Sequence, residues 1–160
     1  MIAGVRDITL SKTQSVFLKP FKGRLVFKKN RDFTFSGFIS AGSGRFNLFG
    51  KKFDFIYDDF KINLNKIDSV RLKVPKLPVK KDMYGNELLT DVKTVLQSVT
   101  GDLVIDNENN KSGIYRDSFP NYPIFRSFER SFVYYDDKSI FNSVYDRENF
   151  YFHLDPFEID

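Results

Sequence analysis

FTFSGFISAGSGRFNLFGKKFDFIYDDFKINL, residues 33–64, alternates apolar and polar side chains over most of its length. A period of two is typical of strands that bury one face. The glycine-rich segments 42–44 and 50–52 indicate turns. The alternation extends outward over Ser15–Pro75 and predicts five or six strands. We expect these strands to be antiparallel, because the turns between them are too short for crossover helices.

The second half of the chain is less regular. Pro75 and Pro78 predict a loop that ends the first run of strands. A helical spacing of i, i+3, i+4 and i+7 then predicts a short helix over residues 88–99, although three of its four apolar residues are β-branched. These four residues are Val92, Val95, Leu96 and Val99.

Strand patterns return at Leu103–Ile105, Ser131–Tyr135 and Asn149–Ile159, and residues 106–113 form a polar loop. The fold class predicted is mainly β: an antiparallel sandwich or an open, curved, repeat-like sheet, with one short helix near residues 88–99. The 19 phenylalanines of the chain are expected to fill its core.

Composition excludes several kinds of chemistry. The chain of 160 residues has no cysteine, which excludes disulfides, thiolate metal sites and a cysteine nucleophile. His153 is the only histidine, which excludes a metal site built from two or three histidines. Alternation places it opposite Phe152 and Leu154, on the solvent side. With no serine-centred nucleophile motif either, we expect no enzyme and no cofactor.

The acidic residues are explained by turns and loops. Asp58, Asp59 and Asp68 lie at predicted turns, as do Asp155 and Glu158, and aspartate there bonds nearby backbone donors. A calcium ion would find oxygen ligands further along, but their spacing fits no EF-hand loop and a solvated loop accounts for them equally. These candidate ligands are Asp102, Asp106, Glu108, Asn109 and Asn110.

Charge divides the chain into two units. Residues 1–81 hold 18 basic and 6 acidic residues, a balance of +12, whereas residues 82–160 hold 7 and 15, a balance of −8. We predict a basic antiparallel β unit over 1–81. Residues 82–160 are predicted as an acidic unit with the short helix, long loops and a truncated second copy of a strand motif. No run of about 18 apolar residues occurs, so no transmembrane segment is expected.

The basic unit carries the candidate binding residues. Solvated strand faces explain the lysines as well, since lysine also blocks unwanted edge pairing. A single-stranded nucleic acid would contact the basic side chains through phosphates and stack on aromatic rings, but the aromatics share the face needed for the core. The candidate basic face consists of Lys19, Lys22, Arg24, Lys28, Lys29, Arg31, Arg45, Lys51 and Lys52.

An internal similarity links the two units. Phe53-x-Phe55-x-Tyr57-Asp58-x-Phe60-x-Ile62-Asn63 matches Phe150-x-Phe152-x-Leu154-Asp155-x-Phe157-x-Ile159-Asp160 at a separation of 97 positions. Fixed-period similarity is typical of repeat proteins, whose units need a neighbour to cover them. We therefore expect a segment of a longer array, or an edge unit completed by a neighbouring repeat or a complementary β edge.

Two stretches carry a family resemblance: FSGFISAGSGRFNLFGKKFDFIYDDFKINLNKIDSVRL (35–72) and GIYRDSFPNYPIFRSFERSFVYYDD with VYDRENFYFHLDPFEID (113–137 and 144–160). They resemble segments of the very large, β-rich, uncharacterised repeat proteins of Bacteroidota. This resemblance implies a non-catalytic structural or binding module of a repetitive cell-envelope or exported protein. A looser likeness is to AsmA/TamB-type β-sheet proteins of the envelope, which implies a lipid groove. The residues themselves leave a cytoplasmic location open.

The charge division predicts association between copies. Opposite charges on the two units would let adjacent copies dock head to tail, and salt would screen that attraction. Sedimentation velocity at about 50 mM and about 500 mM NaCl tests this, with larger species expected only at the lower salt. A monomer indifferent to ionic strength would contradict it.

Overall fold

A single antiparallel sheet contains every strand of the computed structural model, which describes residues 4–85, 87–115, 118–134 and 151–160. These ranges contain no α-helix, only the 3-10 turns η1 (Phe21–Gly23), η2 (Lys29–Arg31) and η3 (Glu108–Asn110). The strands are β1 (Ile8–Ser11), β2 (Val16–Pro20), β3 (Val26–Phe27), β4 (Phe33–Ala41), β5 (Phe46–Ile56), β6 (Lys61–Ile67), β7 (Ser69–Pro75), β8 (Leu89–Gln97), β9 (Val99–Val104), β10 (Ile124–Ser127), β11 (Ser131–Tyr134), β12 (Tyr151–Leu154) and β13 (Phe157–Ile159).

Several of these strands are halves of longer, bent strands. β5 pairs with β7 through Phe46–Phe49 and with β6 through Phe53–Ile56, so β6 and β7 together run along one edge of β5. In the same way β8 and β9 pair with β7 and β6. β10 and β11 continue this arrangement, followed by β12 and β13. The sheet is therefore an up-and-down meander of long antiparallel strands.

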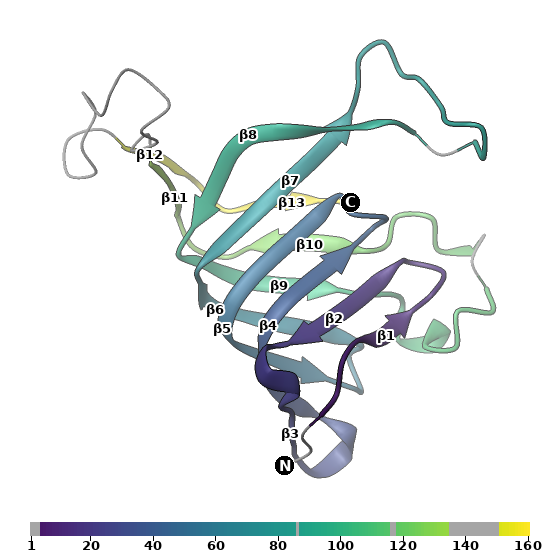
Figure 1. Cartoon of the computed structure of the whole chain (residues 1–160), viewed down its shortest axis with the longest axis vertical. Helices are drawn as coiled ribbons and strands as arrows, with labels where there is room; N and C mark the ends of the chain where they lie inside the picture. The colour runs from purple at the N-terminus through teal and green to yellow at the C-terminus, as the bar shows by residue number, and fades with distance from the viewer. Residues whose placement is uncertain (1–3, 86, 116–117, 135–150) are drawn as a thin grey trace.

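The bends fold the sheet over on itself. In Figure 1, β2, β4, β5, β7 and β8 lie in front, while β6, β9, β10 and β13 cross behind them. Phe46 of β5 stacks on Phe125 of β10 with ring centroids 5.9 Å apart, which brings the two layers into contact. The prediction of a mainly β, open antiparallel sheet is confirmed.

Aromatic and aliphatic side chains fill the space between the layers, so the predicted phenylalanine-rich core is confirmed too. Burying such side chains removes apolar area from water, which is the main favourable term in folding. The buried core consists of Val16, Leu18, Leu25, Phe33, Phe35, Ile39, Ala41, Phe46, Leu48, Phe53, Phe55, Phe60, Ile62, Leu64, Ile67, Val70, Leu96, Val99, Leu103, Ile105, Phe125 and Val133.

The crossings between layers have identifiable local causes. Lys66, before the β6–β7 bend, and Ser98, between β8 and β9, have φ angles of 45° and 55°. These left-handed residues turn the strand sharply, at a cost of about 1 kcal/mol each. At the β10–β11 bend the hydroxyls of Ser127 and Ser131 lie 3.0 Å apart, and Ser127 also donates to the Glu129 carbonyl. At this bend, hydrogen bonds from serine side chains thus take the place of backbone hydrogen bonds between strands.

The expected helix over residues 88–99 is wrong, because residues 89–97 form strand β8. The helical spacing of these residues does not reflect one shared face. Val95 and Leu96 are consecutive residues of β8 and therefore lie on opposite faces of the sheet, and Val99 belongs to the next strand, β9. β8 also has two extra residues opposite Arg71–Lys73, an even number that leaves the alternation in phase. The β-branched residues agree with the strand.

The two similar motifs adopt different structures in the described residues. Residues 53–63 form the end of β5, a turn and the start of β6, which pair as a hairpin. Residues 151–160 instead continue from β12 into β13 without reversing, because β12 pairs with β11 and β13 with β10. Phe55 is 3% exposed, whereas its counterpart Phe152 is 66% exposed. Residues 135 and 149–150 of the predicted strands lie outside the described ranges.

The strands β9 and β10 approach each other so closely at Gly101 that a larger residue should destabilise the fold. A Cβ atom there would overlap the carbonyl oxygen of Arg126 and lie 3.1 Å from the Cα of Ser127. Gly101→Ala should therefore lower the free energy of unfolding by about 3 kcal/mol. Urea unfolding followed by far-ultraviolet circular dichroism measures this change.

Gly44→Ala is the matched control. Gly44 has open space around its Cα and a φ of 89°, so the substitution tests only the left-handed conformation. Its expected cost is about 1–2 kcal/mol. An equal or smaller loss for Gly101→Ala would contradict the close approach of the two strands.

Candidate functional site

The strands β2, β4 and β5 each contain a phenylalanine next to a leucine or isoleucine, and only one of the two can face the core. The pleat sends successive side chains to opposite faces. Leu18, Ile39 and Leu48 point inward and are at most 1% exposed. Their neighbours are all phenylalanines, and these lie on the outer face: Phe17, Phe38 and Phe49.

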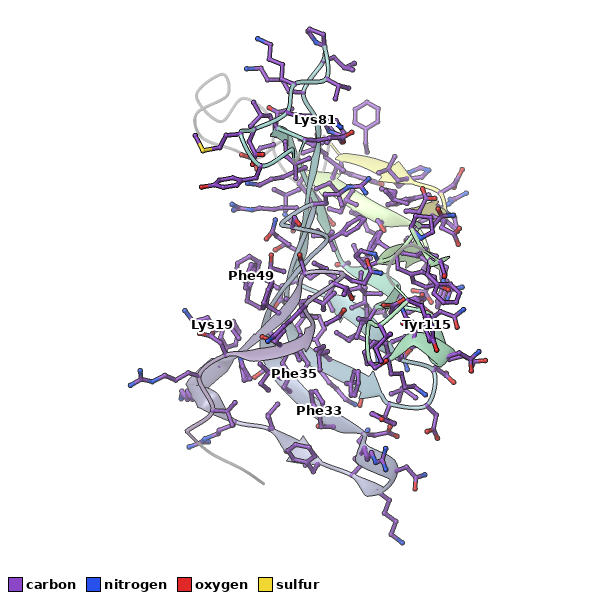
Figure 2. All side chains as sticks on the ribbon, turned by 90° about the vertical axis from the view of Figure 1, so that its right-hand side faces the viewer. Lys19, Phe33, Phe35, Phe49, Lys81 and Tyr115 are labelled. Carbon is purple, nitrogen blue, oxygen red and sulfur yellow. The ribbon has the colours of Figure 1, made fainter. Side chains whose placement is uncertain are left out.

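These rings form a row with a lysine across three strands. Lys19 pairs with Phe38, and Phe38 pairs with Phe49. The rings of Phe38 and Phe49 lie 4.7 Å apart between centroids. Figure 2 shows Phe49 and Lys19 on one side of the layer, with Phe33 and Phe35 on the other, toward the second layer. We call the outer set the outer aromatic face: Phe17, Lys19, Phe21, Lys22, Phe38 and Phe49.

The outer aromatic face contains two shallow hollows that share Lys19 and Phe38. One hollow of about 280 Å³ lies beside Asp7, Phe17 and Leu18. The other, of about 460 Å³, lies beside Pro20, Phe21, Lys22 and Phe49. Each hollow therefore offers an aromatic wall next to an ammonium group, which suits a flat, anionic ligand.

Positive charge surrounds the rings. Lys19 and Lys22 are exposed and form no ion pair within the described ranges. Arg71 of β7 is also exposed and unpaired there, and it lies opposite Asn47 on the same face as Phe49. Asp7 is the one carboxylate that lines either hollow. The face is thus cationic and able to attract anions.

The nine predicted basic residues do not gather in one place. Lys19 and Lys22 belong to the outer aromatic face, and Lys51 lies 4.0 Å from Asp68. The remaining residues take separate positions. Lys28 pairs with Asp54 at 2.8 Å, Arg31 stacks over Tyr57, Arg45 donates to the main-chain oxygen of Asp160 at 2.8 Å, and Arg24, Lys29 and Lys52 are exposed.

The buried carboxylates are already held by other side chains. Asp102 is 1% exposed and accepts two hydrogen bonds of 2.7 Å from Arg126. The hydrogen bond to Asp102 raises the pKa of the Arg126 guanidinium above its usual value, so this group keeps its charge. Asp106 accepts from Gln14 at 3.3 Å and from the Asn110 amide at 3.1 Å. These contacts fasten the loop after β9 to the β1–β2 turn.

No metal site emerges from these groups. Asp102 and Asp106, the first two of the candidate calcium ligands, each have a different set of partners. Across residues 4–85, 87–115, 118–134 and 151–160, no group of three or more histidine, aspartate or glutamate side chains could hold an ion. His153 is exposed on the edge strand β12.

A further hollow lies at the end of the β1–β2 and β4–β5 turns. It has a volume of about 420 Å³ and contains Arg45 as its one charged side chain, with hydroxyl groups and two aromatic rings. Its walls are Thr13, Gln14, Ser15, Gly42, Ser43, Arg45, Phe119, Pro120, Tyr122 and Pro123. The guanidinium of Arg45 is engaged by the Asp160 carbonyl and lies over the Phe46 ring.

Sequence reasoning missed Phe17, Phe38, Phe49 and Arg71 as site residues. A signal for the three rings was available in the pairs Phe17-Leu18, Phe38-Ile39 and Leu48-Phe49. Within a strand, two neighbouring apolar residues cannot both enter the same core. One side chain of each pair must therefore face outward. Adjacent apolar residues within a strand thus indicate an exposed apolar face.

No protein-family model, curated protein or solved structure matches this chain. The resemblances drawn from the sequence therefore stay predictions. In the described part of the chain, no helix is long and apolar enough to cross a membrane.

The two faces should respond differently to loss of a ring. Phe49 is 36% exposed and Phe53 is fully buried, although both belong to β5. Phe53→Ala should lower the free energy of unfolding by about 3–5 kcal/mol. Phe49→Thr should cost at most about 1.5 kcal/mol, mainly through the lost contact with Phe38. Urea unfolding checks both values, and equal losses would show that Phe49 belongs to the core.

Proposed function

We propose that this chain is a non-catalytic binding module that recognises its ligand with the outer aromatic face. The observation that carries the proposal is the outward position of Phe17, Phe38 and Phe49 on neighbouring strands, beside unpaired lysines. When a ligand covers exposed aromatic side chains, apolar surface is removed from water, and this burial favours the bound complex. Strands of a packed sheet hold these rings at fixed positions, as a recognition surface requires.

The rest of the same face shows that the rings are concentrated. The outward positions beside Phe38 on β4 are occupied by the small polar residues Thr34, Ser36 and Ser40. On β5, Phe49 lies between the polar Asn47 and the exposed Lys51 and Lys52. Such residues are the ordinary choice for a strand face in water. Phenylalanines in the middle of this polar surface therefore support a role in contact with another molecule.

The absence of a catalytic role is also part of the proposal. The buried carboxylates Asp102 and Asp106 are engaged in hydrogen bonds, which supports a structural role for them. A place for this module inside a larger repetitive envelope protein, next to neighbouring repeats, stays a prediction from the sequence resemblance. The contact between Phe46 and Phe125 fills the interior at this end and offers no support for a lipid groove.

A panel of probes tests the proposal. The protein is titrated with a single-stranded oligothymidylate, vesicles containing phosphatidylglycerol and a soluble β-glucan, and its self-association is measured by sedimentation. We expect at least one interaction that Phe49→Thr weakens about fivefold or more, since burying such a ring contributes about 1–3 kcal/mol.

Phe128→Thr is the matched control, because Phe128 is 55% exposed and lies between β10 and β11, outside the outer aromatic face. This variant should bind as the parent does. If none of the probes and no second copy binds, or if Phe49→Thr leaves every interaction unchanged, the proposed function is wrong.

A further inference from the structure

We infer that the outer aromatic face binds single-stranded nucleic acid, an inference that rests on the function proposed above. The aromatic rings provide the first argument. Bases without a complementary strand expose flat, apolar surfaces that stack on aromatic side chains, with little preference for sequence. Phe38 and Phe49 lie on adjacent strands with centroids 4.7 Å apart, and Phe17 lies one strand further along. A sheet surface with such rings is a known form of stacking platform.

The positions of the basic residues provide the second argument. Lys19 borders both hollows, Lys22 borders the larger one, and Arg71 lies one strand beyond Phe49. Cationic side chains therefore flank the rings on two sides. There they could contact the phosphates that lie on either side of each stacked base. Because Lys19, Lys22 and Arg71 form no ion pair within the described residues, no internal partner has to be displaced before they contact phosphate.

The depth of the rings favours nucleic acid over a lipid surface. The apolar face of an amphipathic helix that binds a membrane surface is buried about 5–10 Å into the boundary between headgroups and acyl chains. Phe38 is half-buried, and Phe49, Phe17 and Phe21 are 36%, 44% and 49% exposed, so each of these residues keeps more than half of its surface against the protein. Rings in this position present their surface to a flat group that approaches the sheet. A nucleic-acid base is such a group. The two hollows beside Lys19 would each accept such a group.

Fluorescence anisotropy with a labelled 12-nucleotide oligothymidylate tests the inference. Three phosphate contacts predict a slope of log affinity against log salt of about −2, so affinity should fall about 15- to 20-fold from 50 to 200 mM NaCl. Phe49→Thr should weaken binding about tenfold through lost stacking. Lys19→Gln should make the slope shallower by about 0.7, since one phosphate contact is lost.

Three controls isolate the effect of the face. Phe128→Thr should leave the affinity unchanged, and circular dichroism should show the same melting curve for Lys19→Gln as for the parent. A duplex of the same length should bind more weakly, because its bases are already stacked. Equal affinity for the duplex, or equal affinity of the parent and Phe49→Thr, would overturn the inference.

The outcomes separate the ligand class from the proposed function. If the oligonucleotide does not bind at 50 mM NaCl while phosphatidylglycerol vesicles or a second copy do, and Phe49→Thr weakens that binding, the nucleic-acid inference is wrong but the binding face stands. If neither the oligonucleotide nor any other probe depends on Phe49, both proposals are wrong.

Discussion

Burial of one aromatic face between the two halves of a folded sheet is the interaction on which the rest of this structure depends. Phe46, Phe53 and Phe125 are at most 1% exposed, and Phe46 and Phe125 come from different layers. An antiparallel sheet with one apolar face must cover that face, and here it does so by folding over itself rather than by adding helices. Folding the sheet over requires bends at Lys66 and Ser98, whose left-handed backbone conformations are locally unfavourable.

The same burial determines what faces outward. Once Leu18, Ile39 and Leu48 are directed into the core, the pleat leaves no inward position for Phe17, Phe38 and Phe49. The rings are therefore held at the surface by the packing beneath them rather than by a loop. This arrangement links stability to the proposed recognition, because the residues that stabilise the fold also set the spacing of the exposed rings.

Much of this fold follows from local patterns, and the remainder depends on contacts between distant residues. Alternation predicts the antiparallel strands of residues 15–75 and the phenylalanine core. The turn expected at residues 50–52 is wrong, because these residues continue strand β5. The helix expected over 88–99 is wrong because residues from both faces of β8 and from the start of β9 fall at helical spacing. Nothing in a local pattern shows that β10 crosses behind β5, which the stacking of Phe46 on Phe125 establishes.

The candidate site shows the same division between local pattern and global packing. Of the nine basic residues proposed from the sequence, Lys19 and Lys22 lie on the outer aromatic face, while others such as Lys28 and Arg45 have partners elsewhere. The sequence predicts that the phenylalanines fill the core, because composition does not distinguish the two faces of a strand. Which residue of each adjacent apolar pair points inward is decided by the opposite layer, whose position the sequence does not reveal.

The most direct measurement is the exposure of individual rings in solution. Fluorine NMR of protein labelled with 4-fluorophenylalanine, assigned by single Phe→Leu substitutions, reports each ring, and a soluble paramagnetic probe broadens those that water reaches. The account predicts strong broadening for Phe17 and Phe49, with Phe46 and Phe53 left sharp. If Phe49 is as protected as Phe53, the two-faced sheet described above is wrong.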